Sequence, residues 1–119
     1  MIFGYSLIVP VYNSESTLEL LCKRLVIVLE SITENYEIIL INDGSSDGSS
    51  IILEKINKIN SNFKIINLMR NYGQHNALLC GMRIATYNMT ITIDDDLQYQ
   101  PEEIPKLIEK INEGYDVVY

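Results

Sequence analysis

Short apolar segments alternate along the chain with longer segments in which apolar residues recur at helical spacing. The short segments are rich in Ile, Val, Leu and Tyr and are bounded by polar turns, so they predict β-strands at residues 5–12, 36–41, 63–69, 89–93 and 115–119. The longer segments predict helices at about residues 16–33, 48–60, 74–86 and 101–114. This alternation predicts a Rossmann-like α/β fold, in which helices cover both faces of a mainly parallel sheet in three layers.

Local signals indicate where the helices begin and end. Ser16 and Glu19 have the spacing of a capping box at the start of the first helix, and Asp47 is the expected N-cap of the second. Pro101 fits the first turn of the fourth helix, which Gly114 is expected to end. Because the fifth predicted strand stops at the last residue, we expect residues 1–119 to be one domain, truncated within the fold of a longer protein.

Composition excludes several classes of partner. The chain has 119 residues and a formal net charge of −7, and it carries no stripe of Lys or Arg, so a nucleic-acid partner is not expected. No apolar run approaches the roughly 20 residues that cross a bilayer, and the amino terminus lacks the pattern of a signal peptide. Cys22 and Cys80 are isolated and predict two reduced, buried thiols, which fits a cytoplasmic protein.

Polar residues follow each of the first four predicted strands. They are Asn13, Asn42-Asp43-Gly44-Ser45, Arg70-Asn71-Tyr72-Gly73 and Asp94-Asp95-Asp96. The carboxyl ends of parallel strands meet at one edge of the sheet, where ligands bind in open α/β folds. We therefore expect the functional site at this edge.

The triplet Asp94-Asp95-Asp96 is the strongest chemical signal in the chain. In an extended segment alternate side chains share a face, so Asp94 and Asp96 are expected to lie side by side while Asp95 points away. Neighbouring carboxylates repel each other unless a cation, a shared proton or water compensates, and oxygen ligands suit Mg²⁺ or Mn²⁺. The alternative interpretation is a solvated acidic loop at the start of the helix near Pro101.

The other polar loops carry residue types that can bind a nucleotide, each with a structural alternative. Tyr12 is either a core residue or a ring that stacks on a base, and Asp43 is either a turn residue or an acceptor for hydrogen bonds from a base or ribose. Arg70 lies just before a predicted helix amino terminus, where an anion is favoured. The glycine-rich phosphate loops of Walker and dinucleotide-binding proteins are absent, so we expect a metal that bridges a diphosphate to Asp94 and Asp96.

Four segments together resemble the motifs of family 2 glycosyltransferases, which have the GT-A fold. They are VPVYN at 9–13, INDGSSDGS at 41–49, LMRNYGQHNAL at 68–78 and TIDDDLQYQPEE at 92–103, in that family's usual order and spacing. The aspartate motif and the Arg-Asn-Tyr-Gly-Gln-His run are most similar to the branch that transfers a sugar from a nucleotide to a polyprenyl phosphate, such as dolichyl or undecaprenyl phosphate.

The resemblance implies a metal-dependent, inverting transfer of a sugar from a UDP- or GDP-sugar to a polyprenyl phosphate or a growing glycan. It implies Mg²⁺ or Mn²⁺ as cofactor, with Asp94, Asp96 and Gln98 as metal ligands and the two aspartates as catalytic residues. The nucleotide and donor contacts expected from the motifs and the loops are Pro10, Tyr12, Asn13, Ile41, Asp43, Arg70 and Asp95. Many family members have Glu directly after the Asn of the first motif, where this chain has Ser14 followed by Glu15.

Family members continue with an acceptor-binding part and, in the polyprenyl branch, with membrane helices. The resemblance therefore implies a donor-binding domain that lies in the cytoplasm or at the cytoplasmic face of a membrane and is inactive alone. A nucleotide-binding module without turnover is the alternative, and an open sheet edge can pair with a second copy. A receiver-like signalling domain would need an Asp at the end of the third strand, where the chain has Leu68-Met69-Arg70.

Overall fold

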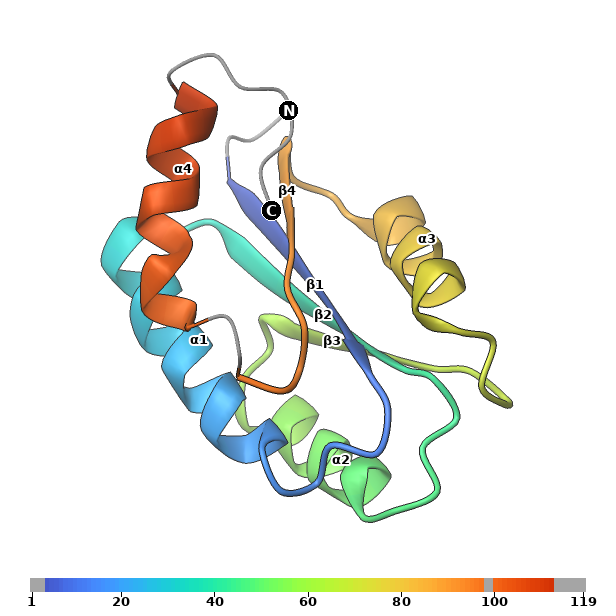
Figure 1. Cartoon of the computed structure of the whole chain (residues 1–119). Coiled ribbons are helices and arrows are strands. Elements are labelled where there is room, and N and C mark those ends of the chain that lie inside the picture. The colour runs from blue at the N-terminus through green and yellow to red at the C-terminus, as the bar shows by residue number, and fades with distance from the viewer. Residues whose placement is uncertain (1–3, 98–99, 113–119) are drawn as a thin grey trace.

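The structure is a computed structural model that describes residues 4–97 and 100–112. In chain order its elements are β1 Tyr5–Val11, α1 Leu18–Ile32, β2 Tyr36–Asn42, α2 Ser49–Ile59, β3 Phe63–Asn67, α3 Gln74–Ile84, β4 Met89–Thr92, the 3₁₀ turn η1 Pro101–Glu103 and α4 Ile104–Asn112 (Figure 1). The predicted strand at 115–119, Gly114 and Gln98 lie outside the described residues. Within the described ranges, no helix combines the length and the apolar character needed to cross a bilayer.

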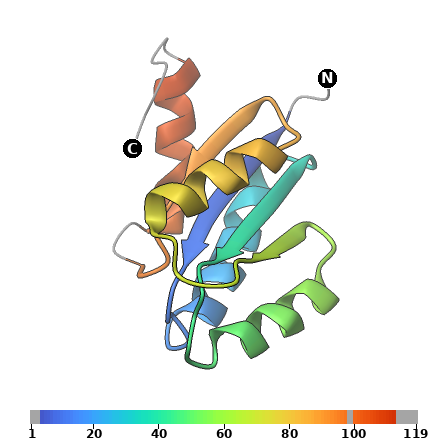
Figure 2. The same cartoon turned by 90° about the vertical axis from the view of Figure 1, so that its right-hand side faces the viewer.

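The strands form a parallel sheet in the order β3-β2-β1-β4. β1 pairs with β2 from Tyr5 opposite Tyr36 to Val11 opposite Asn42, and with β4 from Tyr5 opposite Met89. Helices α1, α2 and α4 cover one face of the sheet and α3 covers the other (Figures 1 and 2). The predicted three-layer α/β architecture is therefore confirmed.

The central strands are buried on both faces, which explains why their sequences are nearly continuous runs of apolar residues. The larger core lies between the sheet and α1, α2 and α4, and the smaller core, beneath α3, contains Ile8, Ile39, Ile41 and Ala77. A Cβ atom at Gly81 would lie 2.6 Å from Ile8 Cγ2, so glycine lets α3 pack close to the sheet.

Some predicted element boundaries are wrong. β3 ends at Asn67 and β4 at Thr92, earlier than predicted, and the N-cap of α1 is Thr17, without a capping side-chain hydrogen bond. The capping box at Ser16 is not formed; instead a turn precedes the helix, in which the carbonyl of Ser14 accepts the N–H groups of Thr17 (3.1 Å) and Leu18 (3.0 Å). The first N–H groups of the helix are thus bound by the backbone carbonyl of Ser14 rather than by a capping side chain.

The amino-terminal edge of the sheet contains a buried carboxylate. Glu37 is 3% exposed, and its Oε2 accepts hydrogen bonds from Ser6 Oγ (2.5 Å), Thr86 N (2.6 Å) and Thr86 Oγ1 (3.0 Å). Its Oε1 receives no regular hydrogen bond from the described residues but lies 2.5 Å from Lys64 Nζ in an ion pair. The network connects three strands and the segment that enters β4.

Candidate functional site

The loops that follow β1 and β2 are joined at the carboxyl edge of the sheet. Asn13 Oδ1 accepts the N–H groups of Ser46 (2.8 Å) and Asp47 (3.3 Å), while Asn13 N donates to Ser45 Oγ (3.0 Å). The φ angle of Asn13 is +50°, in the left-handed region that Asn adopts more readily than most residues. The expected meeting of these polar loops is confirmed.

Asp47 stabilises the start of α2. By backbone geometry Gly48 rather than Asp47 is the N-cap, but Asp47 Oδ1 accepts Ser49 N (2.9 Å) and Oδ2 accepts Glu15 N (3.2 Å). Desolvation raises the pKa of Asp47, but hydrogen bonds from Ser49 and Glu15 outweigh it and hold the pKa below its usual value. Asp47 therefore supplies the predicted capping hydrogen bond from one residue earlier.

The middle aspartate of the triplet faces the segment between β1 and α1. Asp95 Oδ2 accepts hydrogen bonds from Tyr12 N (3.1 Å) and Ser14 Oγ, and its carbonyl accepts one from Thr17 Oγ1 (2.8 Å). These contacts hold the loop after β4 against the start of α1.

Asp94 and Asp96 are exposed on either side of the half-buried Asp95. The triplet follows the end of β4, and residues 95–97 form a bend, so the strand alternation behind the prediction does not hold there. Gln74 Nε2, at the start of α3, donates to Asp94 Oδ1 (2.6 Å) and connects α3 to this loop.

The carboxylate oxygens of this loop have the chemistry of ligands for a cation that also binds phosphates. Within the described ranges no group of three or more His, Cys, Asp or Glu side chains is arranged to hold a metal ion. Mg²⁺ is commonly bound through one or two carboxylates while phosphates and water complete the shell. Asp94 and Asp96 fit such a partial site, and Gln98, the third predicted ligand, lies outside the described residues.

Asp43 is buried and anchors the loop after β3. Its Oδ1 accepts Tyr72 N (2.8 Å) and its Oδ2 accepts Gly73 N (3.0 Å). Gly44 has a φ of +70°, and a Cβ atom there would lie 2.4 Å from Asn71 N, so glycine lets the loop pack against β2. The carboxylate thus fixes the loop that carries Arg70.

Replacement of Asp43 by Ala should lower the free energy of unfolding by about 2 kcal/mol, because two backbone N–H groups lose a charged acceptor. Urea denaturation measures the loss. Asn71→Ala is the matched control, because Asn71 Oδ1 is a second, exposed acceptor for Gly73 N (2.9 Å) and its removal should cost less than about 0.5 kcal/mol. Equal losses in the two variants would contradict the anchoring role of Asp43.

The other residues predicted to contact a nucleotide ligand differ in how exposed they are. Tyr12 is 48% exposed, and the exposed Arg70 lies over the ring of Tyr72, with its guanidinium carbon 5.0 Å from the ring centroid. Pro10 and Ile41 are buried, and Ile41 belongs to the core beneath α3. Tyr12 and Arg70 therefore lie at the surface of the molecule, while Pro10 and Ile41 lie within the supporting sheet.

Sequence reasoning missed the side chains that hold the loops in place. They include Ser14 and Thr17, which bind Asp95, and Gln74, which binds Asp94. Arg24 also binds Glu102, which lies 78 residues away. The spacing of such distant pairs carries no periodic signal, so they could not be found without the fold.

Comparisons with known proteins identify the family of the chain and proteins with a similar fold. The model of the family described as Glycosyl transferase family 2 matches residues 6–119. Staphylococcus aureus TarS 1-349 in complex with UDP-GlcNAc is similar, with a TM-score of 0.74, 27% identity, and coverage of 93% of this chain and 32% of that chain. TarS 1-349 in complex with UDP has a TM-score of 0.73 and 26% identity, again over 93% of this chain and 32% of that chain.

The mannosyltransferase PcManGT from Pyrobaculum calidifontis, in complex with GDP-Man and Mn²⁺, shares the fold, with a TM-score of 0.72 and 18% identity over 83% of this chain and 29% of that chain. The chain thus spans about a third of the length of each of these structures. Because the family model covers all but the first few residues, the chain belongs to glycosyl transferase family 2.

Proposed function

We propose that this chain is the donor-binding part of a glycosyltransferase that uses a nucleotide-diphosphate sugar. The observation that carries the proposal is the exposure of Asp94 and Asp96 beside anchored polar loops, at the carboxyl edge of a family 2 fold. The similarity to TarS bound to UDP-GlcNAc and to UDP supports a nucleotide-sugar donor. PcManGT shows that the same fold accommodates GDP-Man together with Mn²⁺.

In this proposal the aspartates act at the diphosphate. Asp94 and Asp96, with Gln98, hold Mg²⁺ or Mn²⁺, and the bound metal supplies charge stabilisation for the departing nucleoside diphosphate. Asp95 is expected to contact the ribose. Its hydrogen bonds with Tyr12 N and Ser14 Oγ also hold the β1–α1 segment in place. The exposed guanidinium of Arg70 adds positive charge for the donor's phosphates.

The nucleoside is bound by residues from β1 and β2. The exposed ring of Tyr12 is available to stack on the base, and Asn13 orders the adjoining loops. Pro10 and Ile41 are buried in the sheet beneath these loops and support them from below. Asp43, expected to contact the nucleoside, sets the position of the loop that carries Arg70 by accepting Tyr72 N and Gly73 N.

The acceptor in this proposal is a polyprenyl phosphate or a growing glycan. An inverting displacement forms a bond from the acceptor oxygen to the anomeric carbon while the bond from that carbon to the diphosphate breaks. A phosphate acceptor is already ionised at neutral pH, so this reaction needs no strong base. The expected location is the cytoplasm or the cytoplasmic face of a membrane, where nucleotide sugar and lipid phosphate meet.

A nucleotide-binding module without turnover is the second candidate for these 119 residues alone. The chain corresponds to only 32% of TarS 1-349, and that observation favours binding without catalysis in the isolated segment. A single-turnover assay with a bound nucleotide sugar separates binding from transfer.

Calorimetric titration of UDP and then GDP, in Mn²⁺ and in chelator, tests the proposal. We expect one nucleotide to bind in a Mn²⁺-dependent manner, which would also identify the base of the donor. A folded sample that binds neither nucleotide would contradict the proposal.

A further inference from the structure

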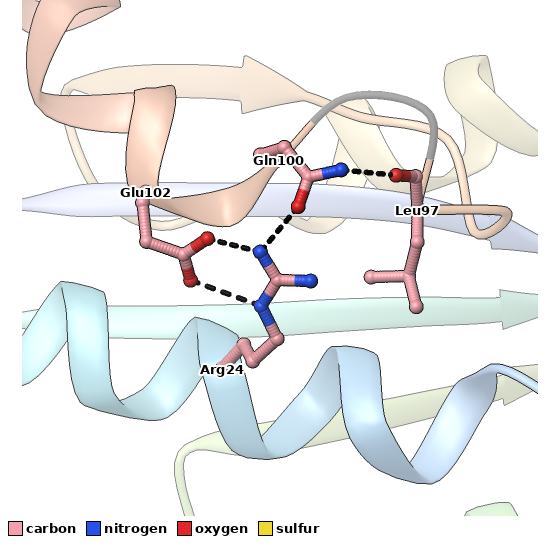
Figure 3. Close-up of polar contacts among 4 residues, drawn as sticks. All are labelled: Arg24, Leu97, Gln100 and Glu102. Atoms are coloured by element: carbon pink, nitrogen blue, oxygen red, sulfur yellow. Dashed lines mark hydrogen bonds and ion pairs between the residues drawn. The ribbon is translucent and has the colours of Figure 1, made fainter.

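Arg24 on α1 contacts the segment that follows the aspartate triplet. Its guanidinium donates from Nη2 to Gln100 Oε1 (2.5 Å) and from Nε to Glu102 Oε2 (3.0 Å), and Nη2 also pairs with Glu102 Oε1 (Figure 3). Gln100 Nε2 in turn donates to the carbonyl of Leu97 (2.9 Å). A continuous set of hydrogen bonds therefore runs from α1 to the residue directly after Asp96.

This contact differs from an ordinary surface ion pair, which contributes little because two flexible side chains must be ordered in water. Arg24 binds both oxygens of the Glu102 carboxylate, and such a two-point contact restricts orientation as well as distance. The side chain of Glu102 is 54% exposed but that of Arg24 only 24%, and the same guanidinium also binds Gln100. The arrangement thus holds η1 against α1 in one geometry.

Leu97 connects this arrangement to the triplet. Its φ angle is +63°, a left-handed conformation that is unfavourable for a branched apolar residue and persists only where surrounding contacts maintain it. Its side chain packs against the larger core, and its carbonyl accepts the hydrogen bond from Gln100. The backbone direction at the end of the triplet therefore depends on contacts that Arg24 organises.

We propose that Arg24 is a positioning residue for the loop that carries Asp94 and Asp96, and that it acts through Gln100 and Glu102. Gln74 and the contacts of Asp95 hold the start of this loop, whereas Arg24 holds its end. The inference rests on the proposed metal-dependent function. Arg24 itself is not a proposed ligand; it fixes the position of the loop whose carboxylates would bind the cation.

The test is a Mn²⁺ titration of the wild type, Arg24→Met and Arg24→Lys, without nucleotide and then with saturating UDP or GDP. Loss of a group that directly contacts a metal ligand typically weakens metal affinity 10- to 100-fold. Arg24 acts on the loop through Gln100 and Glu102 rather than on a ligand directly, so we expect the lower end of that range, about tenfold, in both variants. Arg24→Lys keeps the charge but loses the planar two-point contact, so it separates positioning from electrostatics and keeps the test valid if Arg24→Met folds poorly.

Lys23→Met is the matched control. Lys23 is the exposed neighbour of Arg24 on α1 and has no ion pair within the described ranges, so its removal deletes the same charge without touching the loop. We expect its Mn²⁺ affinity to stay within twofold of the wild type. Urea denaturation of all variants shows that each is folded at the titration temperature.

The outcomes separate the two proposals. If the wild type binds Mn²⁺ and the folded Arg24 variants bind it equally well, the positioning role is wrong and the proposed function stands. If the folded wild type binds no Mn²⁺ even with UDP or GDP present, both the metal-dependent function and the proposed role of Arg24 are wrong.

Discussion

Replacement of Glu37 by Gln should lower the free energy of unfolding by about 3 kcal/mol at neutral pH. Burial raises the pKa of Glu37, but the ion pair with Lys64 and the hydrogen bonds from Ser6 and Thr86 outweigh it and lower the pKa from 4.5 to about 2. The folded protein thus stabilises the ionised carboxylate more than the unfolded chain does. Gln keeps the shape of the side chain but places a neutral amide opposite Lys64.

The lowered pKa of Glu37 also predicts how the free energy of unfolding depends on pH. Because the folded pKa lies below the unfolded value of 4.5, the contribution of Glu37 is complete above about pH 5 and is lost as the pH falls through about 2. The stability difference between the wild type and Glu37→Gln should therefore be largest at neutral pH. It should shrink steadily between about pH 5 and pH 2.

Urea denaturation at several pH values measures this difference, with Glu54→Gln as control. Glu54 is exposed on α2 and forms no ion pair within the part of the chain that the structure describes, so its variant should follow the wild type at every pH. A constant difference between Glu37→Gln and the wild type across this range would show that ionisation of Glu37 does not stabilise the fold.

The architecture could be predicted because it depends on local patterns that repeat. The nearly continuous apolar runs of β1 and β2 indicated strands covered on both faces, and the structure confirms a parallel sheet with α3 on the side opposite α1. Parallel strands also bring their carboxyl ends together, and for this reason the polar loops were expected at one edge. These inferences needed no knowledge of individual contacts.

The contacts within the site could not be predicted because they depend on side chains far apart in the chain. Asp43 was expected to face a ligand or a turn, yet both of its oxygens bind N–H groups of the loop after β3. The left-handed φ of Leu97 has no signal in its residue type, since Leu disfavours that conformation. Both features arise from tertiary packing.

Replacement of Asp96 by Asn should weaken Mn²⁺-dependent nucleotide binding about 100-fold while the fold stays intact. Loss of a residue that contacts a metal ligand already weakens metal affinity 10- to 100-fold. Loss of a charged ligand itself should therefore reach the upper end of that range. Asp96 is exposed, so the free energy of unfolding should change by less than about 1 kcal/mol.

Calorimetric titration of the nucleotide that binds the wild type, in Mn²⁺ and in chelator, measures this effect. Glu103→Gln is the control, because Glu103 lies beyond the loop, pairs with Lys106 and carries the same charge as Asp96. If Asp96 binds the metal, Asp96→Asn should show nearly the same weak affinity in Mn²⁺ and in chelator, whereas Glu103→Gln should keep the wild-type difference. Full Mn²⁺-dependent affinity in Asp96→Asn would instead show that Asp96 is not a metal ligand. The exposure of its carboxylate would then reflect hydration rather than metal binding.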